Sequence, residues 1–100
     1  MRNQHINTAP GVTFFSTGDL TKKQYMFAVA PGVDMADALN SASDLLSTVS
    51  EAITDAGTGD APLAGNSAWL VLHTINSAKA VIDALWLAAE QQVDKKESAA

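Results

Sequence analysis

The sequence has no cysteine, and only 6% of its 100 residues are aromatic. Without cysteine there is no disulfide, no thiolate metal ligand and no cysteine nucleophile. This composition is compatible with a reducing compartment, and we therefore expect a cytoplasmic protein.

Basic residues are also scarce. Six Lys and Arg stand against eleven Asp and Glu, which gives a formal net charge of −5. This balance argues against binding to a phosphate backbone, so we expect no nucleic-acid partner. No basic residue lies between Lys23 and Lys79, and Gly57, Gly59 and Gly65 do not form a phosphate-binding motif. A nucleotide cofactor is not expected.

Long apolar runs are missing as well. The most apolar stretch, residues 78–89, is interrupted by Lys79 and Asp83 and falls short of the roughly 20 apolar residues that a membrane span needs. The first residues contain Arg2 but no apolar segment of the kind found in signal peptides. We expect neither membrane insertion nor export.

Catalytic and metal-binding patterns are weak. The only histidines are His5 and His73, so a zinc site would need Asp ligands from distant segments. Ser67, Asn76 and Ser77 lie near His73 in the sequence, but they lack the order of a catalytic triad. Residues 55–60 resemble a calcium loop without its third acidic ligand and its closing Glu. We therefore expect no enzymatic activity, no metal and no cofactor.

What is present indicates one folded domain, because 47% of the residues are hydrophobic and only 17% are charged. We expect a flexible N-terminal segment over residues 1–11, a single domain over residues 12–93, and a flexible C-terminal tail over residues 94–100. Within the domain the sequence predicts an α+β, mostly helical fold, with an N-terminal β-hairpin followed by a long antiparallel helical hairpin.

The β-hairpin is predicted from two short β-branched and aromatic runs, residues 12–16 and 25–30. A polar connection with Gly18 and Asp19 separates them. The period of two places Tyr25, Phe27 and Val29 on the face toward the helices. An isolated hairpin is marginally stable in water, so it must pack against another element.

The first helix is predicted over residues 35–56, with Asp34 as N-cap and Gly57 as the C-terminal stop. Its apolar residues recur at steps of three and four: Met35, Ala38, Leu39, Ala42, Leu46, Val49, Ile53 and Ala56.

A second, longer helix is predicted from Asn66 or Ser67 to about Val93, and it is apolar around most of its circumference. One helix and one hairpin cannot enclose it, so we expect a homodimer in which the second helices pack together as a four-helix bundle flanked by two hairpins. The expected interface residues are Trp69, Leu72, Ile75, Ile82, Trp86 and Leu87. The alternative is a monomer whose hairpin covers this apolar arc.

Acidic residues mark the other side of the first helix, where Asp37, Asp44 and Glu51 repeat every seven residues. Their axial spacing is about 10.5 Å, whereas duplex DNA carries a charge roughly every 1.7 Å, so a nucleic-acid mimic is a poor fit. The surface is either a solvated face or a docking face for a basic protein.

Residues 27–46 resemble the signature of a family of small bacterial proteins, a domain of unknown function with the number three-zero-seven-seven. The matching features are the Pro31-Gly32 turn after an apolar strand and the pairs at residues 38–39, 42–43 and 45–46. Residues around Trp69 and 77–81 are similar to the family's closing helix. The resemblance implies a fold over about residues 14–93 and no activity.

These features together favour a non-enzymatic, homodimeric protein–protein interaction module. Two alternatives stay open. One is a small acidic inhibitor, of the phage or mobile-element type, that docks on a basic host protein. The other is a small-molecule binder with an apolar cleft near Trp69 and Trp86 at the dimer seam.

Overall fold

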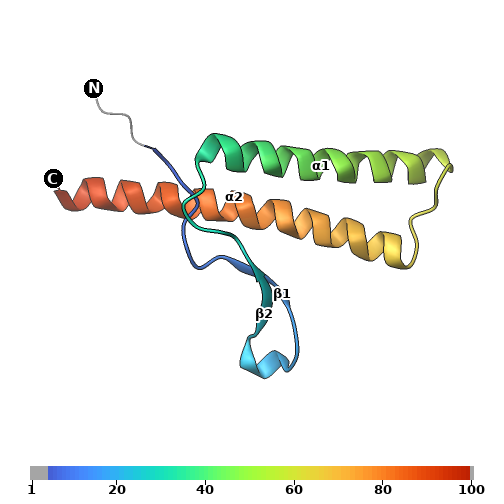
Figure 1. The fold of residues 1–100 in the computed structure, drawn as a ribbon, viewed down its shortest axis with the longest axis horizontal. Helices are drawn as coiled ribbons and strands as arrows, with labels where there is room; N and C mark the ends of the chain where they lie inside the picture. The colour runs from blue at the N-terminus through green and yellow to red at the C-terminus, as the bar shows by residue number, and fades with distance from the viewer. Residues whose placement is uncertain (1–4, 100) are drawn as a thin grey trace.

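The computed structural model describes residues 5–99, apart from the side chains of Leu20 and residues 95–99. Its elements are β1 (Thr13–Ser16), a 3-10 turn (Leu20–Lys22), β2 (Tyr25–Ala28), α1 (Met35–Thr58) and α2 (Asn66–Ala99). The antiparallel strands form a hairpin, and the two helices lie side by side as a second hairpin (Figure 1). The predicted α+β, mostly helical fold is confirmed.

The molecule is flat and elongated. Its radius of gyration is 17.0 Å and its extents are 56 × 38 × 17 Å, whereas a compact chain of this length has a radius of gyration of about 13 Å. The β-hairpin projects from α2 on the side away from α1 (Figure 1). This shape leaves little interior in which large side chains could be buried.

An aromatic cluster attaches the β-hairpin to α2. Phe14 lies opposite Phe27 in the strand pair, and the ring centroids of these two residues are 6.2 and 5.2 Å from that of His73. Phe15 has a positive φ of 65°, which is rare for a bulky residue. Its ring nevertheless contacts the same cluster, 5.5 Å from His73. Phe27 therefore faces the helices as predicted, although all of β2 is exposed.

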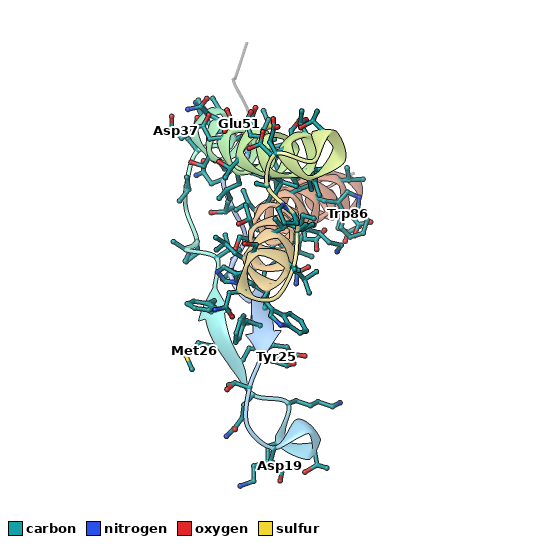
Figure 2. The ribbon with its side chains drawn as sticks, turned by 90° about the vertical axis from the view of Figure 1, so that its right-hand side faces the viewer. Asp19, Tyr25, Met26, Asp37, Glu51 and Trp86 are labelled. Carbon is teal, nitrogen blue, oxygen red and sulfur yellow. The ribbon has the colours of Figure 1, made fainter. Side chains whose placement is uncertain are left out.

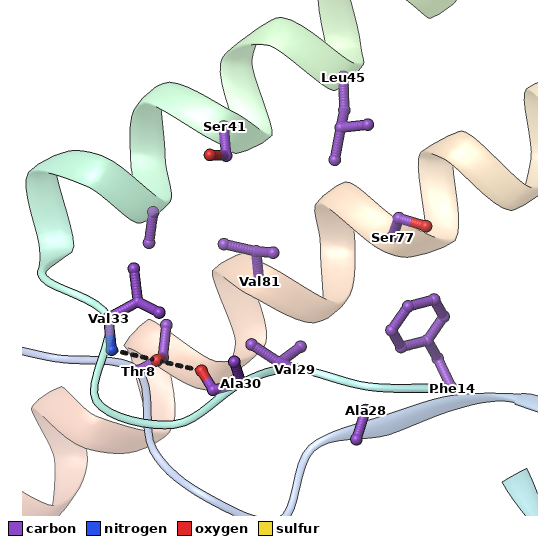
Figure 3. A pocket seen from close by; sticks show the side chains of 11 residues that line it. Thr8, Phe14, Ala28, Val29, Ala30, Val33, Ser41, Leu45, Ser77 and Val81 are labelled. Atoms are coloured by element: carbon purple, nitrogen blue, oxygen red, sulfur yellow. Dashed lines mark hydrogen bonds between the residues drawn. The ribbon is translucent and has the colours of Figure 1, made fainter. Parts of the chain in front are cut away.

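The N-terminal segment differs from the expected flexible lead-in. Thr8 is buried; its hydroxyl donates to the Ala30 carbonyl at 2.6 Å and accepts the Val33 N–H at 2.9 Å (Figure 3). The Ala9 N–H donates to the Ala84 carbonyl at 3.1 Å. Backbone hydrogen bonds tie this segment to the domain, and such bonds leave no apolar period in the sequence. Residues 1–4 lie outside the described residues.

Helix α1 begins as predicted and ends later. The Asp34 carboxylate accepts the Ala36 N–H at 3.0 Å, as an N-cap does. The predicted stop at Gly57 is wrong, because the helix continues to Thr58 and the C-cap is Gly59. Gly59 has φ 85° and donates its N–H to the Ala56 carbonyl at 3.2 Å. Only this second glycine adopts the left-handed conformation that closes a helix.

Helix α2 also extends past its predicted end. It continues from Val93 to Ala99, so the expected flexible tail is helical up to that residue. No Gly or Pro interrupts this stretch, and charged residues are compatible with a solvated helical end. Ala100 lies outside the described residues.

The core consists almost entirely of small residues. No large side chain among the described residues is fully buried, and the buried apolar residues are Ala9, Ala38, Ala42, Ala78, Ala80, Ala84 and Leu85. Alanines let the two helices approach closely, but they remove little apolar surface from water. Many of the larger apolar side chains of both helices therefore lie outside this core and are exposed.

Candidate interaction surface

The apolar residues of α1 form two neighbouring stripes. The inner stripe faces α2 and is buried or half-buried: Ala38, Ala42, Leu45, Val49, Ala52 and Ala56. The outer stripe holds the larger residues, which are 41–47% exposed: Met35, Leu39, Leu46 and Ile53. The single apolar face predicted for this helix is thus divided into an inner stripe in which four of six residues are alanine and an outer stripe made only of larger residues.

Helix α2 shows the same division. Ala78 and Leu85 are buried against the rest of the chain. A second set of larger residues is exposed, from 38% for Ile75 to 62% for Trp86: Leu72, Ile75, Ile82, Trp86 and Val93.

The exposed stripes of the two helices lie on the same side of the helix pair. Leu39 and Leu46 of α1 line one groove of about 410 Å³ together with Ile82 of α2. We call the surface formed by the two exposed stripes the open face. It consists of Met35, Leu39, Leu46, Ile53, Leu72, Ile75, Ile82, Trp86 and Val93.

The rest of the chain covers the opposite side. The segment that joins β2 to α1 crosses there, and Val29 and Ala30 line a groove of about 270 Å³ with Leu45 and Val81 (Figure 3). Trp86 projects on the other side of the helix pair (Figure 2). The β-hairpin borders the open face at Leu72 but leaves its members 38–62% exposed. The monomeric alternative required the hairpin to cover this arc.

The open face follows a heptad spacing on both helices. Its members in α1 are residues 35, 39, 46 and 53, and in α2 they are residues 72, 75, 82, 86 and 93. The positions that complete the three–four alternation are Ala42 and Val49 of the inner stripe in α1, and Lys79 and Ala89 in α2. Alternating steps of three and four are typical of helices that pack side by side along a seam. One seam position of α2 is charged. It is Lys79, whose Nζ lies 2.7 Å from Oδ2 of Asp83.

Four of the six predicted interface residues lie on the open face: Leu72, Ile75, Ile82 and Trp86. Trp69 is 70% exposed but lies beside the β-hairpin. Leu87 is half-buried, about 100° around the helix from Trp86. The α1 residues of the open face were not predicted as interface. Their 3-4 spacing is visible in the sequence, but which of them face α2 is not.

Trp69 belongs to a groove between α2 and the hairpin, which meets the open face at Leu72. The groove has a volume of about 580 Å³ and is lined by Phe15, Ser16, Tyr25, Trp69, Leu72, His73 and Asn76. Trp69 and Trp86 are 17 positions apart on one helix, about 26 Å along its axis. Within one subunit the two indoles therefore do not line a common groove, and a cleft at the dimer seam stays a prediction.

His73 serves as a packing residue in this structure. Its ring contacts three phenylalanine rings. Its Nδ1 is buried and has no hydrogen-bond partner among the described residues. Over all the residues that the structure describes, no group of three or more His, Asp or Glu side chains is placed to hold a metal ion.

The predicted acidic residues lie together on an exposed side of α1. Asp37, Asp44 and Glu51 are all exposed, and about 20° of helical rotation separates each from the next. Figure 2 shows Asp37 and Glu51 along the outside of this helix. None of them forms an ion pair within the described residues. A docking role for this face stays a prediction.

Comparison with protein families matches residues 8–88 to a family described as a protein of unknown function, DUF3077. The chain belongs to the DUF3077 family. The match includes both strands, α1 and most of α2, and it confirms the resemblance seen in the sequence. No curated protein and no solved structure matches the chain. Neither helix, over its described residues, has a stretch long and apolar enough to cross a membrane.

Proposed function

We propose that this DUF3077 protein is a non-enzymatic, homodimeric protein–protein interaction module of the cytoplasm. In this proposal two copies meet through the open face and form a four-helix bundle with one β-hairpin on each flank. A single observation carries the proposal. Nine large apolar side chains are exposed along the two helices, while no large side chain among the described residues is fully buried.

The area of the open face supports a stable association. The nine side chains expose roughly 800 Å² in total, which is what each partner contributes to an interface of standard size. Area alone does not set affinity, because association also costs translational freedom, side-chain ordering and desolvation. A face of this size is nevertheless large enough for a stable interface.

A second copy of the chain is the partner that fits the open face best. The face carries large apolar residues along each of its two helices, and two such helix pairs stacked on each other build a four-helix bundle. A symmetric dimer also uses the same surface on both subunits, so it covers the open face of each subunit at once. The monomer, by contrast, would be left with a core made of alanines.

Sedimentation equilibrium at micromolar protein concentration tests the dimer. We expect the mass of two chains for the wild type. Leu46→Glu and Ile82→Glu each place a charge within the open face, and each should shift the mass to one chain. Leu70→Glu is a matched control for Ile82→Glu. Leu70 also lies on α2 and is 66% exposed, but it is outside the open face. A wild-type mass of one chain would contradict the proposal.

The groove at Trp69 favours a second candidate function, the binding of a small apolar molecule. Its volume falls within the range of ligand sites, and Trp69, Tyr25 and Phe15 supply aromatic surface. Fluorescence of Trp69 in a Trp86→Phe background, measured against a panel of planar aromatic metabolites, tests this function. Quenching that is lost in Tyr25→Ala supports it, and an unchanged signal across the panel opposes it.

A further inference from the structure

We infer that Lys79 sets the orientation of the dimer. In this arrangement α2 runs antiparallel to α2 of a second copy, and Lys79 of each subunit faces Asp83 of the partner subunit. The inference rests on the proposed dimer and adds the direction in which the two copies meet.

Lys79 is unusual because it is charged and occupies a seam position. It stands between Ile75 and Ile82 in the heptad spacing of α2, and its side chain is 70% exposed. In the single chain its ammonium group pairs with Asp83, whose side chain is 47% exposed. A polar residue at one seam position specifies register and orientation at some cost in stability.

Dimerisation changes the surroundings of this ion pair. When the open face is covered, Lys79 loses water, and a charge without water needs a well-placed partner. Pairs that cross the interface satisfy this need in one orientation only, so they discriminate against other arrangements.

The position of the open face brings the two groups together across a symmetric interface. Its α2 stripe runs from Leu72 to Val93, so its midpoint lies between residues 82 and 83. A two-fold axis that allows the whole stripe to pair with itself passes near this midpoint. Antiparallel α2 helices then bring Lys79 within about one helical turn of Asp83 of the partner subunit.

The other face-to-face arrangement would stack α2 on α1 of the partner. Lys79 would then meet the part of α1 that borders Ile82 within one chain, where the polar side chains are Ser43, Ser47 and Ser50. The carboxylates Asp37, Asp44 and Glu51 lie elsewhere on α1 and offer it no partner. Charge complementarity therefore favours α2 against α2.

Mixing two charge-reversed variants tests the orientation. Lys79→Glu and Asp83→Lys each place like charges within one chain, but together they create two attractive pairs across the seam. We expect native mass spectrometry of an equimolar mixture to show heterodimer at about fivefold its statistical ratio. Lys22→Glu mixed with Asp44→Lys carries the same charge changes away from the seam, and it should give the statistical distribution.

Cross-linking supplies an independent measurement, because the chain has no cysteine. Near the two-fold axis, Ile82→Cys should form a cross-linked dimer with a short thiol-specific reagent. Leu72→Cys should not, since antiparallel helices separate the two copies of this position by about 30 Å.

The outcomes separate the two proposals. The orientation is overturned if the charge-reversed variants mix statistically, or if residues 72 and 82 cross-link equally. The proposed dimer still stands in that case if the wild type has the mass of two chains. A one-chain mass of the wild type overturns both.

Discussion

The inner and outer stripes of α1 are both apolar, yet the inner stripe is mostly alanine and the outer stripe consists of larger residues. The inner stripe begins with Ala38 and Ala42, which are buried, whereas the outer stripe carries Leu46 and Ile53, which are 45–47% exposed. Small residues permit close contact between helices of one chain, while large ones supply the area that an interface between chains requires. Apolar character alone therefore does not say which surface a helix buries within its own subunit.

A substitution on the open face should have the largest effect. Trp86→Ala removes the most exposed aromatic side chain of the open face, and we expect it to weaken dimerisation by about 2–4 kcal/mol, as for an interface hot spot. Sedimentation at several concentrations measures the change. Helix content by circular dichroism should remain at the wild-type value at high protein concentration. A dissociation constant equal to that of the wild type would remove Trp86 from the interface.

The buried contacts within one chain should instead be sensitive to a larger side chain, which lowers the free energy of unfolding. Ala84 has no exposed surface and accepts the Ala9 N–H through its carbonyl. Ala84→Leu should lower the free energy of unfolding by about 1–3 kcal/mol, because a leucine overpacks the contact. Urea denaturation measures the loss. Ala88→Leu, at a half-buried position one turn further on, should cost less. If both variants had the same free energy of unfolding, the contact at Ala84 would be no tighter than the contact at Ala88.

The N-terminal segment provides a third kind of contact, which depends on hydrogen bonds. Thr8→Val keeps the shape of the side chain but leaves the Ala30 carbonyl and the Val33 N–H without this partner. We expect a loss of about 1–2 kcal/mol in the free energy of unfolding. Thr8→Ser retains the hydroxyl and should recover most of it. If serine and valine behaved alike, the hydroxyl would have no role in stability.

The tip of the β-hairpin should show the smallest effect. The Asp19 carboxylate accepts hydrogen bonds from the hydroxyl and the N–H of Thr21, which lower its pKa below the ordinary value. Its contribution is therefore present above the ordinary pKa and is lost as the pH falls through the lowered one. Titration followed by NMR should show the shift in the wild type and a smaller one in Thr21→Val. Neither stripe of α1 should be affected.

Local signals in the sequence predicted most elements correctly. Asp34 caps α1, the Pro31-Gly32 turn ends the hairpin, and the apolar spacing of both helices is visible without coordinates. The end of α1 was misplaced because two glycines lie close together and the conformation of each depends on the whole turn. The anchored segment at Thr8 and Ala9 escaped prediction, since its partners are more than 20 residues away.

The candidate surface was only half predictable for a similar reason. Leu72, Ile75, Ile82 and Trp86 were expected at an interface because α2 is too apolar for one neighbour to cover. Leu39 and Leu46 were predicted only as part of one apolar face of α1, since their spacing fits a contact with α2 as well as the outer stripe. About 100° of rotation per residue separates adjacent positions, so the choice depends on how the two helices are turned toward each other.

The sequence alone determined a β-hairpin and two long amphipathic helices. It also determined that these elements have more apolar surface than a single chain can bury. That much depends on composition and on periods of two and 3.6 residues, which are local properties. Which side of the helix pair stays uncovered was decided by the tertiary structure. The segment between β2 and α1 crosses one side and leaves the other open, and this path depends on contacts between residues far apart in the sequence.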